Sequence, residues 1–98
     1  MHLPHATALA EARSHLAALA DRARTFEAAL EYDRVLLRLD TIHGDDTPAT
    51  HDVAITDLNA LFDVAETAIE ALTGFGVDPL TVELLLASLE DARDLDTP

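Results

Sequence analysis

Apolar residues recur every three or four positions along most of the chain, the spacing that puts them on one face of an α-helix. Between residues 6 and 43, leucine or alanine also recurs every seven positions, which is a coiled-coil-like seam. The members of this seam are Leu9, Leu16, Ala23, Leu30 and Leu37. The pattern predicts one long helix over residues 6–43. Asp33 and Asp40 interrupt the companion apolar series, so the seam does not continue cleanly to the helix end.

Two shorter segments carry the same periodicity. The stripe of residues 48–73 has apolar residues on one face and acids opposite, which predicts a helix half in the core. Residues 79–94 predict a third helix with a face of Val82, Leu85 and Leu89. Asp78 is a good N-cap and Pro79 a favoured first helical residue, so this last boundary has a clear local signal.

The connections at residues 44–47 and 74–78 are short, and short connections make consecutive helices antiparallel. We therefore expect an all-α protein, an up-down-up three-helix bundle. The 98 residues predict a single domain, with residues 1–5 and 95–98 frayed. The first helix would be ~55 Å long, longer than either partner. Part of its seam then lacks an internal partner and predicts a homodimer through this helix. The alternative is a monomer whose first helix bends near residues 22–25 and folds back.

Two sets of leucines are candidates for a partner or dimer interface. Leu9, Leu16 and Leu19 belong to the part of the seam that the shorter helices would leave uncovered. Leu80, Leu84 and Leu95 lie on the side of the third helix away from its core face. Single exposed leucines are ordinary, but a strip of them suggests a binding surface.

The charge narrows the partners to be expected. The net charge is −13, lysine is absent, and residues 41–98 carry thirteen acids against Arg93 alone. Such a chain should repel nucleic acid and anionic membranes and attract a basic protein surface. The alternative is that the acidity only keeps the chain soluble. The sequence has no cysteine, no apolar run of membrane length and no signal-peptide pattern, so we expect a cytoplasmic protein.

One stretch, IHGDDTPATHD at residues 42–52, has suitable residue types for a metal or pH-sensitive site. Its weak candidate ligands are His43, Asp45, Asp46 and His51. The acids do not alternate as in calcium loops. Local roles also account for the stretch: Gly44 ends the first helix, and Thr47 and Pro48 begin the second. His51 is then expected on the core face of the second helix. We expect no bound cofactor.

No catalytic constellation is present in the sequence, so we do not expect an enzyme. The favoured interpretation is a small acidic protein–protein interaction module with a regulatory or accessory role. One alternative is an acidic inhibitor that mimics nucleic acid, with a row of carboxylates at Asp52, Asp63, Glu66 and Glu70. Another is a small metal or pH sensor built on the 43–52 stretch.

Overall fold

The computed structural model describes residues 2–97, and within them every regular element is helical. The four α-helices are α1 (Leu3–Arg22), α2 (Phe26–His43), α3 (Leu58–Ala71) and α4 (Pro79–Leu95). A short 3₁₀ helix, η1 (Leu72–Phe75), follows α3 directly. The expected all-α class is confirmed, but there are four helices rather than three.

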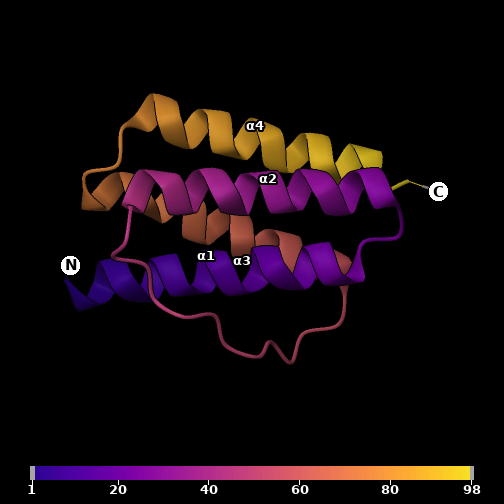
Figure 1. The fold of residues 1–98 in the computed structure, drawn as a ribbon, viewed down its shortest axis with the longest axis horizontal. Coiled ribbons are helices and arrows are strands. Elements are labelled where there is room, and N and C mark those ends of the chain that lie inside the picture. Colours follow the sequence, from indigo (N-terminus) through magenta and orange to yellow (C-terminus); the bar gives the residue numbers. More distant parts are fainter. Residues whose placement is uncertain (1, 98) are drawn as a thin grey trace.

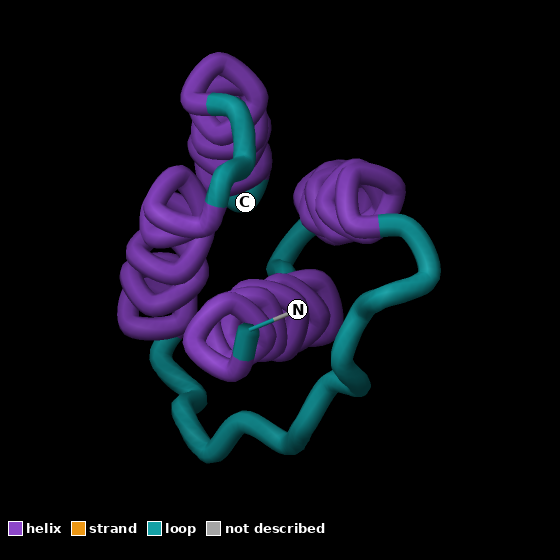
Figure 2. The backbone as a smooth tube through the Cα atoms, turned by 90° about the vertical axis from the view of Figure 1, so that its left-hand side faces the viewer, coloured by secondary structure: helices purple, strands orange, loops and turns teal. Residues whose placement is uncertain are grey.

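The helices occupy the corners of a bundle (Figures 1 and 2). Helix α1 packs against α2 and α3, and α4 packs against the same two helices, so α1 and α4 are diagonally opposite. Helices α2 and α3 run in the same direction, because the long connection between them carries the chain back along α1. Each packed pair of α-helices is therefore antiparallel.

The chain breaks at residues 23–25, so the prediction of one helix over residues 6–43 is wrong. The bend lies at the position given by the alternative interpretation, in which the first helix bends near residues 22–25. Helix α2 folds back along α1. Thr25 caps α2 by accepting a hydrogen bond from the Ala28 N–H at 3.1 Å. The carboxylate of Asp96 accepts from the N–H groups of Arg24 (2.5 Å) and Thr25 (3.1 Å). The backbone groups that a continuous helix would satisfy internally are thus partly satisfied from the far end of the chain.

Folding back changes which residues of the seam are covered. Leu9, Leu16 and Leu19 are buried within the single chain. The expectation that they lack an internal partner is therefore wrong. The argument for a dimer through this helix depended on that expectation and no longer holds. Leu30 and Leu37, from the same seven-residue series, are exposed instead. The buried face of α2 consists of Ala28, Tyr32, Val35 and Leu39.

The second helix begins at Leu58, so the predicted start at Pro48 is also wrong, as is the N-cap at Thr47. Residues 45–57, which we call the strap, cross the outer side of α1 without forming a helix (Figures 1 and 2). Ser14 Oγ accepts from the His51 N–H at 3.0 Å, and the Arg22 guanidinium donates to the Ile55 carbonyl. The cap of α3 is Asp57, whose carboxylate accepts from Ala60 N–H at 3.1 Å.

The third predicted helix is confirmed to within one residue. Helix α4 begins at Pro79, and the Asp78 carboxylate accepts from the Leu80 N–H at 3.0 Å. Neither chain end is frayed over the residues described. Residues 3–5 form the first turn of α1, and Asp96 is buried, whereas Met1 and Pro98 lie outside the described residues.

The core runs along the centre of the bundle and is built from leucine, alanine and a few larger side chains. Tyr32 is the largest side chain in it and is only 2% exposed. Burial raises the pKa of Tyr32 to about 12, and the negative charge of Asp96 adds to this effect. The remaining members with no more than 3% exposure are Leu9, Ala12, Leu16, Leu19, Ala28, Val35, Leu39, Leu61, Phe62, Ala65, Ile69, Leu72, Val82, Leu85, Leu89 and Ala92.

Candidate interaction surface

A largely apolar groove of about 740 Å³ runs between α2 and α4. On α4 the groove borders the core, because the buried Leu85 is among the residues that line it. Its lining residues on α2 are Leu37, Arg38, Thr41 and Ile42, and on α4 they are Thr81, Leu84, Leu85, Ala87, Ser88 and Asp91. We call this surface the groove.

Large apolar side chains stand exposed at the groove. Leu37 is 66% exposed, Leu84 59% and Ile42 42%, while Leu80 continues the row toward the start of α4 at 62%. A folded chain gains by covering such side chains, at roughly 25 cal/mol per Å² of apolar surface removed from water. Several of them around one concave surface are typical of a binding site rather than of ordinary exposed leucine.

The strip continues toward the opposite end of α4. Leu95 is 45% exposed and lies with Glu31, Asp91 and Asp94 around a second, smaller hollow. These three carboxylates make this end of the surface acidic. Leu80 and Leu95 are fifteen positions apart, which corresponds to ~22 Å along α4. The exposed strip is therefore about four helical turns long and acidic at one end.

Arg38 is a cationic group in the groove, and its guanidinium donates to Ser88 Oγ at 2.9 Å. This bond joins α2 to α4 across the surface. Nearby on α2, Arg34 forms an exposed ion pair with Glu31 at 3.3 Å. Arg38 keeps its positive charge, because a hydroxyl is a neutral acceptor, and Arg34 offsets the charge of Glu31. The net negative charge at the Leu95 end therefore comes from Asp91 and Asp94.

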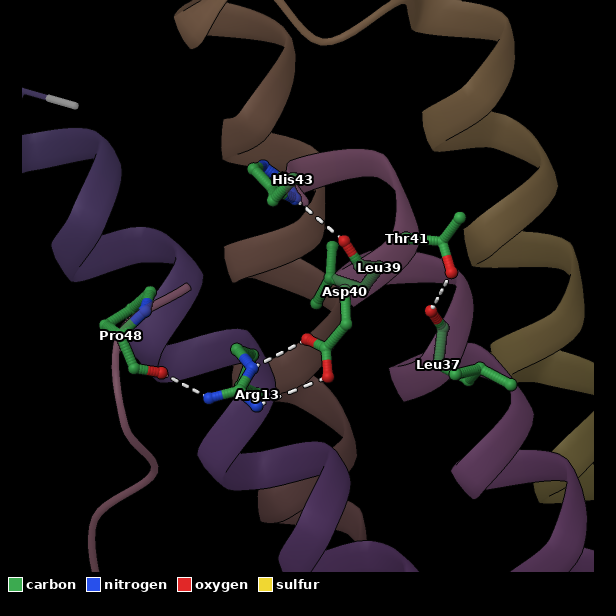
Figure 3. A network of polar contacts seen from close by, with 7 residues as sticks. All are labelled: Arg13, Leu37, Leu39, Asp40, Thr41, His43 and Pro48. Atoms are coloured by element: carbon green, nitrogen blue, oxygen red, sulfur yellow. Dashed lines mark hydrogen bonds and ion pairs between the residues drawn. The ribbon is translucent and has the colours of Figure 1, made fainter. Parts of the chain in front are cut away.

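The rotation of α2 that turns Leu37 outward is set by a polar cluster (Figure 3). Arg13 on α1 donates from Nε and a terminal nitrogen to the two carboxylate oxygens of Asp40, at 2.7 and 3.2 Å. The same guanidinium also donates to the Pro48 carbonyl of the strap. Bidentate arginine–carboxylate pairs have a fixed planar geometry. This one links α1, α2 and the strap, and explains why an acid interrupts the apolar series at Asp40.

Three of the six leucines predicted for an interface are exposed, and the other three are buried. Leu80, Leu84 and Leu95 are exposed as expected, and their role as an interface stays a prediction. Sequence reasoning missed the contribution of α2, because Leu37 had been assigned to the seam and Ile42 had not been considered as a surface residue. The misplaced acids Asp33 and Asp40 were the available signal that the apolar face changes along this segment.

The four weak metal-ligand candidates do not converge. His43 ends α2 and faces His5, whereas His51 lies in the middle of the strap against Glu11 of α1. Over residues 2–97, no group of three or more histidine, aspartate or glutamate side chains is arranged to hold a metal ion. The expectation that His51 lies on a helical core face is wrong, because the residue is exposed and its ring faces the Asp52 carbonyl at 3.2 Å.

His5 and His43 form a pair that sequence reasoning missed, because His5 was assigned to a frayed end. Their Nε2 atoms are 3.2 Å apart, and the His5 ring stacks on Phe75 of η1 with centroids 5.1 Å apart. His43 Nδ1–H donates to the Leu39 carbonyl at 2.8 Å, which fixes its tautomer. Partial burial lowers the pKa of His5, and the His43 ring lowers it further.

A second histidine cluster lies under the strap. His15 is buried and its Nδ1–H donates to the Glu11 carbonyl at 2.7 Å. The Glu11 carboxylate is 3.6 Å from both His15 Nδ1 and His51 Nε2. These contacts hold the centre of the strap on α1. Because His15 Nδ1–H is used in the bond to the Glu11 carbonyl, this nitrogen has no lone pair to offer a metal ion.

The carboxylate row that suggested nucleic-acid mimicry is interrupted. Asp63, Glu66 and Glu70 lie on α3, but Asp52 lies in the strap. The continuous helical row on which that alternative depended therefore loses one member.

No helix within residues 2–97 combines the length and the apolar character needed to cross a membrane. Comparison with known proteins finds no family model, no curated protein and no solved structure that matches this chain.

Proposed function

We propose that the protein is a small non-catalytic interaction module that binds an amphipathic helix of another protein in the groove between α2 and α4. The observation that carries the proposal is the set of exposed Leu37, Ile42 and Leu84 around one apolar groove, which the exposed Leu80 extends along α4. Helix-in-groove recognition uses apolar anchors spaced at three, four and seven residues. A ligand of about fifteen residues would match the ~22 Å between Leu80 and Leu95.

The charge favours a basic partner over a second copy of this chain. Two copies at −13 each would repel one another on approach. A helix with lysine or arginine beside its apolar stripe would instead meet Asp91 and Asp94 at the Leu95 end of the surface. Rim charges of this kind raise the association rate, while the apolar contacts supply most of the affinity. Since the protein would act by binding and not by catalysis, we propose a regulatory or accessory role.

The test uses a synthetic fluorescent peptide of fifteen residues with leucines at helical spacing and lysines on the other face. Fluorescence anisotropy should give saturable binding to the full chain. A peptide of the same composition with the leucine spacing scrambled controls for attraction by charge alone. The proposal predicts that the scrambled peptide binds at least tenfold more weakly, because it cannot place its leucines in the groove.

Protein variants then locate the site. Leu84→Ser and Leu37→Ser should each weaken binding about tenfold, since each removes an apolar anchor without changing the charge. Leu3→Ser is the matched control, because Leu3 is exposed but lies on α1 away from the groove. Equal losses in all three variants, or equal binding of both peptides, would refute the proposal. So would a dimer in sedimentation that dissociates on Leu84→Ser, since a second copy would then occupy the groove.

A further inference from the structure

His5 and His43 lie close enough together for one metal ion to contact both rings. We propose that Nε2 of His5 and Nε2 of His43 together bind one divalent transition-metal ion of the zinc, nickel or copper class. This inference is independent of the proposed function, since neither ring lines the groove.

The separation of the two nitrogens carries the proposal. They are 3.2 Å apart, although the two residues are 38 positions apart in the sequence, at the start of α1 and the end of α2. Two nitrogens bound at ~2.0–2.1 Å to one tetrahedral ion lie ~3.3 Å from each other. One ion can therefore bridge both rings with almost no movement of the backbone.

The orientation of each ring supports the same conclusion. A metal-binding histidine usually donates its other ring N–H to a carbonyl or carboxylate. His43 does this, because its Nδ1–H donates to Leu39 carbonyl and its Nε2 then carries the lone pair. His5 is held by stacking on Phe75, with the ring planes only 5° from parallel. Binding requires that the proton between the two Nε2 atoms is lost from that position, and His5 then takes the Nδ1–H tautomer.

The two imidazoles determine which class of ion would bind. With water completing the coordination shell, they suit zinc, nickel or copper better than calcium or magnesium, which prefer oxygen ligands throughout. The ion would join the start of α1 to the end of α2.

The histidine cluster under the strap does not offer an equivalent site. His15 Nδ1 is used in its bond to the Glu11 carbonyl, and the His15 and His51 ring centroids are 6.4 Å apart. His51 therefore provides the matched control for a metal site at His5 and His43.

The test is calorimetric titration of the full chain with ZnCl₂, with MgCl₂ as the control ion. The proposal predicts one zinc ion per chain and no heat with magnesium. His5→Gln and His43→Gln should each weaken zinc binding at least tenfold. His51→Gln should bind zinc as the parent chain does.

Thermal unfolding separates ligand loss from damage to the fold. Each variant is compared with itself in zinc and in EDTA, so any folding defect cancels. At a zinc concentration tenfold above the dissociation constant, the parent chain should melt about 5 °C or more higher than in EDTA. This shift should vanish in His5→Gln, which lies in the first turn of α1 and should not disturb the core. No heat with up to 1 mM zinc, binding kept in both His5→Gln and His43→Gln, or binding lost in His51→Gln would each overturn the proposal.

Discussion

The bend between α1 and α2 depends on one carboxylate at the other end of the chain, and its removal is the sharpest test of the fold. Asp96 accepts from the N–H groups of Arg24 and Thr25 and pairs with the Arg24 guanidinium at 3.8 Å. In return, Thr25 Oγ1–H donates to the Leu95 carbonyl at 2.8 Å. Asp96→Ala removes the acceptor of both backbone bonds and leaves only the Thr25 hydroxyl contact.

The magnitude follows from the geometry. Hydrogen bonds to a charged acceptor contribute roughly 1.5–3 kcal/mol each, and less where water can reach the donor. Arg24 is exposed and Thr25 is half-buried, so we take about 1–1.5 kcal/mol for each backbone bond. The ion pair adds little, because an exposed arginine contributes about 0–1 kcal/mol. Asp96→Ala should therefore lower the free energy of unfolding by about 2–3 kcal/mol, a large part of the ~5–15 kcal/mol of a typical domain.

Urea unfolding followed by circular dichroism measures this loss. Asp96→Asn keeps an oxygen acceptor and loses only the charge, so it should cost about 1 kcal/mol. Asp94→Ala is the control, because Asp94 is exposed two positions earlier and should change stability by less than ~0.5 kcal/mol. If Asp96→Ala unfolds at the same urea concentration as the parent chain, the carboxylate does not hold the bend. If Asp96→Asn costs as much as Asp96→Ala, the charge matters rather than the two hydrogen bonds.

Three further predictions concern the core and the strap. Tyr32 is the only tyrosine and there is no tryptophan, so absorbance near 295 nm should show half-ionisation near pH 12 in the folded chain. Because the unfolded chain loses this proton near pH 10, stability should fall by roughly 2–3 kcal/mol between pH 10 and 12, and a transition at pH 10 without unfolding would contradict the burial. Arg13→Ala should increase thermolysin cleavage within residues 45–57 several-fold, whereas Arg34→Ala should not, and equal rates would show that Arg13 does not hold the strap. Leu39→Ala should lower the free energy of unfolding by about 2–4 kcal/mol in the same urea assay, because its side chain is fully buried, and a change under ~1 kcal/mol would contradict its place in the core.

The elements that sequence reasoning predicted well are those with local signals. Asp78 and Pro79 are a local signal for the start of α4. In the structure Asp78 is the N-cap and Pro79 is the first helical residue, as predicted. The end of the first helical segment at His43 and Gly44 is likewise confirmed, because Gly44 has the positive φ of 63° that ends a helix there.

The errors arose where distant contacts outweighed local preference. Residues 22–25 contain no glycine or proline, and the seven-residue repeat runs across them, so the pattern favoured a continuous helix. The bend is stabilised by Asp96, more than seventy positions away. In the same way, Thr47 and Pro48 form a good local helix start. In the structure, however, the strap is not helical. It is held against α1 by contacts such as the hydrogen bond from the His51 N–H to Ser14 Oγ.

The candidate surface was half predictable for the same reason. Leu80, Leu84 and Leu95 lie off the core face of a correctly predicted helix, so their exposure could be read from the periodicity. The outward turn of Leu37 depends on the fold-back of α2 and on the Arg13–Asp40 pair, neither of which has a local signature.

The central claim is that the groove between α2 and α4 receives an amphipathic basic helix. The most direct measurement is a methyl spectrum of the leucine- and isoleucine-labelled chain, titrated with the fifteen-residue leucine–lysine peptide. The account predicts the largest shift changes at Leu37, Ile42 and Leu84, with Leu3 unchanged. Shifts spread evenly over the exposed methyl groups, or confined to α1 and the strap, would contradict it.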